Sequence, residues 1–278
     1  MPTTTLTDLR KNALTELDDL WSSVTTAVAT DTSTLKDDKL QDFSSAWVKP
    51  DETWVVLPGG PTGAGAQEER RVASLGGNVL TASRPFSGTV QSGVPYDVTH
   101  VFKPSQVETA LKEALPLCFP HLCDSALDSS LTVLANTYHY NVGGLGYYAN
   151  EIFRVEIEVN ATATGYPYET KYGWWVRPDG YLEFAPEELA GRVGKKIRLH
   201  GRKLLAFSGS PSAVPIAAPQ TGLLQAKAIW WLANHMVASK PRKDIERWQA
   251  LELAWAKNYD ERASIFGMRP PTSVIAHR

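Results

Sequence analysis

The stretch Leu223-Leu224-Gln225-Ala226-Lys227-Ala228-Ile229-Trp230-Trp231-Leu232-Ala233-Asn234-His235-Met236-Val237 carries apolar residues around almost its whole circumference when it is drawn as a helix. A helix of this kind is buried on nearly every side. After Pro241, large apolar residues return in steps of three and four, at Ile245, Trp248, Leu251, Trp255 and Tyr259. This spacing predicts a second helix with one buried stripe. Residues 222–266 therefore predict an αα-hairpin.

The hairpin is the predicted core of the fold because of its aromatic residues. A tryptophan ring buries roughly 150–250 Å² and is costly to leave in water. The side chains expected to form this core, or the contacts of a ring of helices, are Trp230, Trp231, Trp248, Leu251, Trp255 and Tyr259. Two further helices are predicted in residues 1–21 and 104–120. In the second of these, Ser105 and Glu108 have the spacing of a capping box.

In two regions between the helices, the spacing of apolar residues changes to every second residue, which is typical of strands. In residues 22–103, the runs Arg70–Leu75 and Asn78–Ser83 flank Gly76-Gly77 and predict a hairpin. In residues 131–207, strict alternation in Glu151–Asn160 predicts a strand with Glu156 on its wet face. A Pro-rich linker, residues 208–221, and an extended C-terminal tail, residues 267–278, complete the chain.

The order of these segments is helix, sheet, helix, sheet and helical hairpin. It predicts an α+β fold: a small helical bundle of N-terminal, central and C-terminal helices that carries two antiparallel β insertions. The second insertion is expected to resemble a β-sandwich.

Composition narrows the class of protein. The chain has 278 residues, 43% of them apolar and 21% charged, which is an ordinary globular mixture. The net charge of −2 and the scattered basic residues give no overall signature of a nucleic-acid-binding protein. The basic residues between Arg192 and Lys203 alternate with apolar ones, which favours a wet strand face over a positive lining for a polyanion. No signal peptide and no apolar run long enough for a membrane span are found.

The search for catalytic chemistry is negative. The Gly-rich loop Gly59–Ala66 lacks the Lys-Ser/Thr of a P-loop, and no dinucleotide fingerprint, nucleophile elbow or zinc-protease motif is present. The six histidines are isolated, and Cys118 and Cys123 are too few for a disulfide framework. We therefore expect no cofactor, no metal and no enzymatic activity. A hydrolase whose residues converge from distant segments stays an open alternative.

Aromatic residues gather in the second β region, and two interpretations of them stay open. They are Tyr138, Tyr140, Tyr147, Tyr148, Tyr166, Tyr168, Tyr172, Trp174 and Trp175. Tyrosine and tryptophan provide semi-polar contact area for a sugar or a protein, but aromatic residues are also simply favoured in strands. Tyr147 and Tyr148, in a Gly-rich loop, are the candidate subunit contact.

A series of segments resembles the neck proteins of tailed bacteriophages. The resemblance covers most of the chain in the order of its features. The segments are Thr30–Leu35, Phe43–Val48, Glu69–Val72, Arg84–Ser87 and Gly93–Val98, then a helix at Pro104–Leu115, and finally Ile197–Lys203 followed by a Pro-rich linker and terminal helices.

The resemblance implies a structural virion protein: a head-to-tail connector, or adaptor, that forms a ring beneath the portal. DNA would pass through the ring without sequence recognition. The implied partners are the portal protein, the next neck or tail protein, and further copies of the chain, with twelve-fold symmetry. The implied location is the neck of the virion, after synthesis in the host cytoplasm. The residues implied to hold the portal lie in the tail: Met268, Arg269, Pro270, Pro271, Val274, Ile275 and Arg278.

An alternative function follows from the aromatic residues rather than from the resemblance. A virion surface protein could use a β-sandwich with exposed tyrosine and tryptophan to bind a receptor or a glycan. This alternative predicts saccharide binding by an isolated monomer or trimer.

Overall fold

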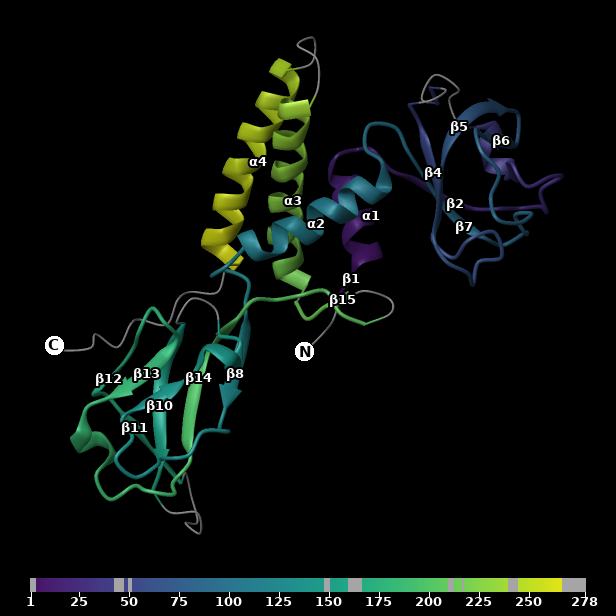
Figure 1. The fold of residues 1–278 in the computed structure, drawn as a ribbon. Helices are drawn as coiled ribbons and strands as arrows, with labels where there is room; N and C mark the ends of the chain where they lie inside the picture. Colours follow the sequence, from purple (N-terminus) through teal and green to yellow (C-terminus); the bar gives the residue numbers. More distant parts are fainter. Residues whose placement is uncertain are drawn as a thin grey trace. The chain divides into compact units, whose positions relative to one another are not determined.

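The computed structural model describes residues 4–42, 48–49, 52–147, 151–159, 167–209, 213–216, 218–239 and 245–266. In these residues the chain forms four α-helices, three short 3₁₀ helices and fifteen strands arranged in four sheets (Figure 1). The predicted fold class, a small helical bundle with two β insertions, is therefore wrong, because the protein is mostly β-rich. The chain divides into two compact units: Met1–Leu117 with Phe207–Arg262, and Cys118–Ala206 with Ala263–Arg278.

The first unit contains a six-stranded antiparallel sheet in the order β2-β7-β4-β5-β6-β3. Its strands are β2 (Trp21–Val24), β3 (Thr34–Lys36), β4 (Trp54–Leu57), β5 (Glu68–Gly76), β6 (Val79–Ala82) and β7 (Pro95–Thr99). The sheet curls on itself. The Thr26 N–H donates to the Lys36 carbonyl at 3.0 Å and Ala27 bridges Lys36, so the chain after β2 meets β3.

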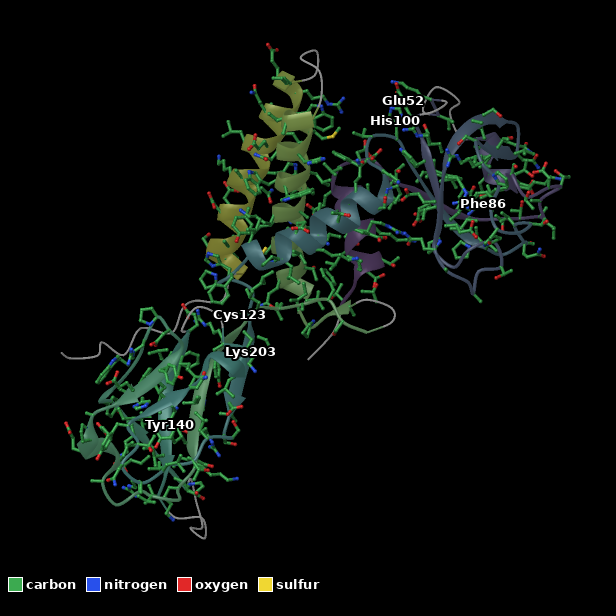
Figure 2. The ribbon with its side chains drawn as sticks, viewed as in Figure 1. Glu52, Phe86, His100, Cys123, Tyr140 and Lys203 are labelled. Carbon is green, nitrogen blue, oxygen red and sulfur yellow. The ribbon has the colours of Figure 1, made fainter. Side chains whose placement is uncertain are left out.

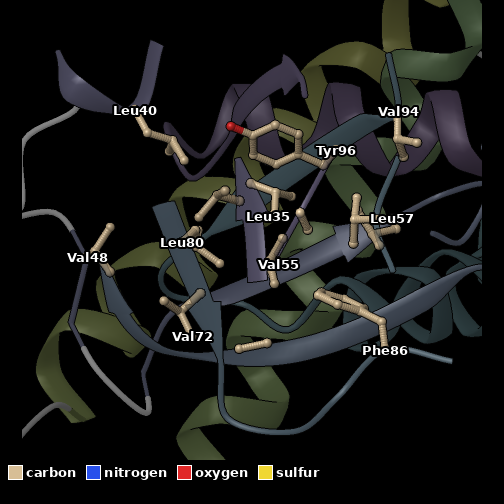
Figure 3. Close-up of a cluster of buried hydrophobic side chains, with 14 residues drawn as sticks. Leu35, Leu40, Val48, Val55, Leu57, Val72, Leu80, Phe86, Val94 and Tyr96 are labelled. Carbon is tan, nitrogen blue, oxygen red and sulfur yellow. The ribbon is translucent and has the colours of Figure 1, made fainter. Parts of the chain in front are cut away.

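The curled sheet encloses a hydrophobic core of its own (Figure 3). Alternate residues of each strand point inward, which is the consequence of a period of two. The predicted hairpin around Gly76-Gly77 is confirmed by β5 and β6, and Gly77 has the positive φ of 57° that a tight turn requires. The fully buried side chains of this core include Leu35, Val55, Leu57, Val72, Leu80, Tyr96 and Val98.

The four helices are α1 (Leu6–Glu16), α2 (Pro104–Leu117), α3 (Ala218–Ser239) and α4 (Ile245–Phe266). Thr5 caps α1, because its hydroxyl accepts from the Asp8 N–H at 3.1 Å. The helix ends at Glu16, earlier than predicted, and Asp18 adopts a left-handed φ of 54°. Trp21, predicted as the last residue of this helix, is instead the first residue of β2.

The start of α2 differs from the predicted capping box. The Ser105 N–H donates to a carboxylate oxygen of Glu69 at 2.8 Å, so the acceptor comes from β5. Glu108, predicted to reach back to Ser105, instead accepts from the buried Arg10 guanidinium. Helices α1, α2 and α3 pack on one another, and a short sheet of β1 (Thr4–Thr5) and β15 (Ala213–Val214) ties the start of the chain to the segment before α3.

The second unit is built from two antiparallel sheets. One has the order β11-β10-β14-β8 and the other β12-β13-β9. Their strands are β8 (Asp124–Asp128), β9 (His139–Asn141), β10 (Ile152–Glu158), β11 (Tyr168–Lys171), β12 (Trp174–Val176), β13 (Tyr181–Phe184) and β14 (Ile197–Lys203). Val155, Ile157 and Leu199 of the first sheet share a core with Leu182 and Phe184 of the second.

Figure 2 places Tyr140 among the strands of the second unit, where its ring meets Phe184 edge-on at 5.9 Å. The same figure shows Cys123 and Lys203 at one end of β8 and β14, where Lys203 lies opposite Asp124 in the strand register. Each unit thus has a core of strands. None of the four helices in the described residues is both long and apolar enough to cross a bilayer.

Candidate functional site

The helical hairpin predicted from the sequence is present as α3 and α4, which run side by side in Figure 1. Polar groups hold the two helices together. The Lys227 ammonium lies 4.0 Å from the ring centroid of Trp230 and 4.6 Å from that of Tyr259. The Asn234 amide donates to Glu252 at 2.7 Å. The Arg262 guanidinium donates to the Gly222 carbonyl, also at 2.7 Å.

The predicted core residues of this hairpin are not equally buried. Trp248 and Tyr259 are buried, with exposed fractions of 5% and 9%. The other four predicted side chains, Trp230, Trp231, Leu251 and Trp255, are only half-buried. The burial of α3 comes instead from its aliphatic residues, such as Leu224, Ile229 and Leu232. Helix α4 packs with one face and leaves the other in water.

The outer face of α4 carries large apolar side chains. Leu253 is 74% exposed and Ile265 is 70% exposed, the highest values for large apolar residues in the described part of the chain. Two alanines close to Leu253 are also exposed: Ala250, about one helical turn before it, and Ala254, the next residue. The charged Glu246, Lys257 and Glu261 share this face, which we call the α4 outer face. Exposed apolar side chains rimmed by charged ones can mark a site of protein–protein interaction.

A groove of about 330 Å³ adjoins the α4 outer face. Its lining comes from the segment after α1, the loop between β7 and α2, and the first half of α4. The lining residues are Leu17, Asp19, Val101, Phe102, Arg247, Trp248, Ala250, Leu251 and Ala254.

Two observations indicate how the groove is built. The Asp19 carboxylate accepts three backbone N–H groups, from His100, Val101 and Phe102, at 2.7–2.8 Å, and so fixes the loop that lines the groove. Burial raises the pKa of Asp19 above its usual value, and the three N–H donors offset part of this rise. In addition, the buried indole N–H of Trp248 has no acceptor among the described residues. A buried tryptophan N–H usually has a partner, so this unpaired donor is an exception in the packing of α4 on the loop.

The aromatic residues of the second unit are divided by the structure. Tyr140 is buried, and the half-buried Trp174 donates its indole N–H to the Lys171 carbonyl at 2.8 Å. By contrast, Tyr172 is 65% exposed and Trp175 is 48% exposed. Trp175 lies beside Glu183, which in turn lies beside His139, on the outer face of the three-stranded sheet.

Tyr147, one of the two candidate subunit contacts, packs inside the second unit. Its hydroxyl donates to the Leu199 carbonyl at 3.0 Å. Its ring also covers Gly201, where an added Cβ would lie 2.5 Å from the Tyr147 Cδ1. A role for Tyr147 between subunits stays a prediction. Tyr148, Tyr166 and all seven predicted portal-binding residues of the tail lie outside the described residues.

The Tyr147 environment leads to a pH prediction. Burial raises the pKa of Tyr147 to about 12, and the nearby Asp128 carboxylate adds to this rise. Because the folded pKa lies above the unfolded value of about 10, the contribution of Tyr147 to stability is present below pH 10 and is lost as the pH rises toward 12. In a spectrophotometric titration, Tyr147→Phe should leave the tyrosinate absorbance gained between about pH 9 and 11 unchanged. In denaturant, the wild type should gain one tyrosinate more than the variant over this range. A reduced gain in the folded variant would contradict the buried position.

Several buried charges were not anticipated from the sequence, among them Glu156 and Arg10. Glu156, predicted to be on a wet face, is fully buried beneath Arg154, Arg198 and His200, whose Nε2 lies 3.0 Å from its carboxylate. Arg10 is fully buried between α1, β7 and α2. The only sequence signal for Arg10 is its place beside Leu6 and Leu9 on the apolar stripe of α1.

No group of three or more potential metal-ligating side chains comes together in the described part of the chain. The candidate surfaces described above are the α4 outer face with its groove and the exposed aromatic residues around Trp175. No protein-family model matches the sequence, and a search of the curated proteins finds no match.

Proposed function

We propose that the chain is a structural subunit of a phage head-to-tail connector, and that the α4 outer face and its groove join it to a second copy of itself in a ring. The observation that carries this proposal is the exposure of Leu253 beside the groove. A large apolar side chain in water is stabilised when a partner covers it, by about 25 cal/mol per Å² of apolar surface.

A second copy is the occupant that the chemistry of this region favours. The α4 outer face supplies apolar side chains together with both acidic and basic groups, Glu246, Lys257 and Glu261. A like subunit can therefore match both the apolar and the charged parts. A ring needs a heterologous interface, in which two different patches meet. The α4 outer face, together with the groove with which it shares Ala250 and Ala254, is proposed as one of these patches. The resemblance to neck proteins adds the portal as the surface on which this ring assembles.

The test is the native mass of the full-length protein, alone and mixed with the portal protein of the same virus. The wild type should join the portal as a ring of several copies. Leu253→Glu places a charge at the centre of the proposed contact and should reduce ring formation at least about tenfold, since an unpaired charge in an interface costs more than 1.4 kcal/mol.

The matched control for this test is Asn12→Glu, which adds the same charge at an exposed position of α1 and should assemble like the wild type. Ring formation by Leu253→Glu at wild-type level would overturn the interface. Deletion of residues 267–278 tests the portal attachment separately: the truncated chain should stay folded and lose the portal. Unchanged portal binding would contradict the role proposed for the tail.

The second candidate function is glycan or receptor binding through the exposed Trp175 and Tyr172. The observation that favours it is their exposure, with Glu183 and His139 beside Trp175 as hydrogen-bonding groups. A wild-type protein that ignores the portal and binds a saccharide as a monomer or trimer would favour this second function over the connector.

A further inference from the structure

A second cavity, a cleft of about 710 Å³, lies on the first unit and has no residue of α4 in its lining. It is formed by β4, β5, the segment after β6 and the segment before α2. Most of its lining is charged or polar, with four basic side chains and one acidic. The lining residues are Trp54, Glu69, Arg70, Arg71, Ser83, Arg84, Pro85 and Lys103.

The Trp54 ring holds two of the cations in the cleft. The guanidinium carbon of Arg71 lies 4.9 Å from the ring centroid, and the Lys103 ammonium lies 5.0 Å from it. A cation over an aromatic ring is attracted by the negative face of the ring. This ring contact orients the two cations and does not itself neutralise either of them.

The acidic groups near the cleft are already engaged. Glu69 accepts from Ser105 at 2.8 Å and pairs with Lys103 at 3.1 Å. Glu68 pairs with Arg70 at 2.7 Å, and Arg70 also donates to the Pro85 carbonyl. These carboxylates therefore compensate Lys103 and Arg70, but they do not reach the other two arginines.

Two guanidinium groups remain available. Arg84 is exposed, and within the described residues it makes no hydrogen bond, ion pair or ring contact. In the same residues, the only contact recorded for the Arg71 side chain is with the Trp54 ring. A guanidinium presents its N–H donors as a planar fork that matches two oxygen atoms of one phosphate or carboxylate.

We propose that this cleft binds the phosphate groups of a nucleic-acid backbone. Three separate segments each contribute a basic group to the cleft: Arg71, Arg84 and Lys103. This is more positive charge than a ligand with a single carboxylate would need. The cleft is also far larger than a single phosphate ion and falls in the size range of ligand sites. Arginine and lysine contacts to phosphates position a nucleic acid without reading its sequence. The binding is therefore expected to be independent of sequence.

This inference concerns a different surface from the proposed ring interface and does not depend on it. In a connector, the cleft would give the chain a weak contact to the passing DNA. The overall charge of −2 keeps the rest of the surface from acting as a general DNA trap.

The experiment is a fluorescence polarisation titration of a labelled DNA duplex of about 20 base pairs with the full-length protein at about 50 mM salt. The wild type should bind with no preference between two unrelated sequences. The logarithm of its affinity should fall with the logarithm of salt with a slope of about −2 to −3, since each neutralised phosphate contributes about −0.9. Arg84→Glu should weaken binding at least about tenfold, and Arg71→Ala about three- to tenfold.

The matched control is Lys112→Glu, an equal charge reversal at an exposed position of α2 in the same unit. It should bind DNA within about twofold of the wild type if the cleft, rather than net charge, is responsible. Thermal unfolding of each variant checks that the fold is retained, which we expect because, among the residues that the structure describes, Arg84 makes no contact that its replacement would remove.

Three results would overturn the proposal: no DNA binding by the wild type, equal binding by Arg84→Glu, or an equal loss in Lys112→Glu. Binding of inorganic pyrophosphate or a mononucleotide without any DNA binding would also overturn it, by assigning the cleft to a small phosphate ligand. The native mass of Arg84→Glu mixed with the portal tests the proposed function separately. The variant should still form the ring, so a loss of DNA binding alone bears only on the cleft.

Discussion

Replacing Arg10 with methionine should lower the free energy of unfolding by about 3–5 kcal/mol, the cost of removing one partner from a buried ion pair. The Arg10 side chain is fully buried. It contacts the Asp97 carboxylate at 3.2 Å, the Glu108 carboxylate at 2.5 Å and the Gln67 side chain at 2.7 Å. Methionine fills a similar volume but leaves Asp97, which is 1% exposed, and Glu108 without this charge.

The remaining partners of Asp97 limit the loss without cancelling it. Lys11 lies 3.1 Å from Asp97 and the Ser22 hydroxyl donates to it at 2.6 Å. The unfolding is measured by chemical denaturation. The matched control is Arg177→Met, which removes a half-exposed arginine from its ion pairs with Asp179 and Glu183 and should cost less than about 1 kcal/mol. Equal losses in the two variants would contradict the central role of Arg10.

Adding Asp97→Asn to Arg10→Met should restore part of the stability, because it removes the buried charge left without its partner. A double variant that is less stable than Arg10→Met by the full cost of a second independent change would show that the two side chains are not coupled. The cluster joins α1, β7 and α2, so its loss should weaken the docking of these helices on the curled sheet.

Replacing Trp248 with alanine should lower the free energy of unfolding by about 3–5 kcal/mol, as expected for truncation of a buried tryptophan. Trp248 meets Phe102 edge-on, with ring centroids 5.6 Å apart, and this contact fixes α4 to the loop between β7 and α2. Trp248→Phe retains an aromatic ring at this contact and should cost much less.

The control for Trp248 lies on the same helix. Leu253→Ala removes a side chain that is 74% exposed and should change the stability of the isolated chain by less than about 0.5 kcal/mol. Chemical denaturation of the three variants checks the prediction. An unchanged transition in Trp248→Ala would show that α4 is not packed on this loop in solution. It would also remove the groove on which the proposed ring interface is based.

The predicted fold class was wrong, and the tryptophans of the helical hairpin show why. The tryptophans of the hairpin were expected to form the core of the whole molecule, but of these four only Trp248 is buried. Trp230 lies under the Lys227 ammonium at 4.0 Å, and Trp255 lies 5.7 Å from the Arg262 guanidinium carbon. Long cationic side chains can thus cover an aromatic ring near the surface. Aromatic content alone therefore does not distinguish a core from a covered surface.

The sequence by itself determined the local elements of this protein. A period near 3.6 marked α2, α3 and α4, and a period of two with paired glycines marked the β5–β6 hairpin. These signals are local, because the spacing of apolar residues along a helix or strand follows from its own geometry. They also placed much of the buried face of α3 correctly.

Only the tertiary structure decided which distant polar residues meet. Arg10 and Asp97 are 87 positions apart, and Glu156 and His200 are 44 apart. Arg71, Arg84 and Lys103 line one cleft because β5, the end of β6 and the start of α2 meet in the curled sheet. Strand order and curl set these contacts, and both arise from how strands separated in the sequence pair. Periodicity along one element carries no information about such pairing, so the buried charges and the basic cleft could not be predicted from the sequence.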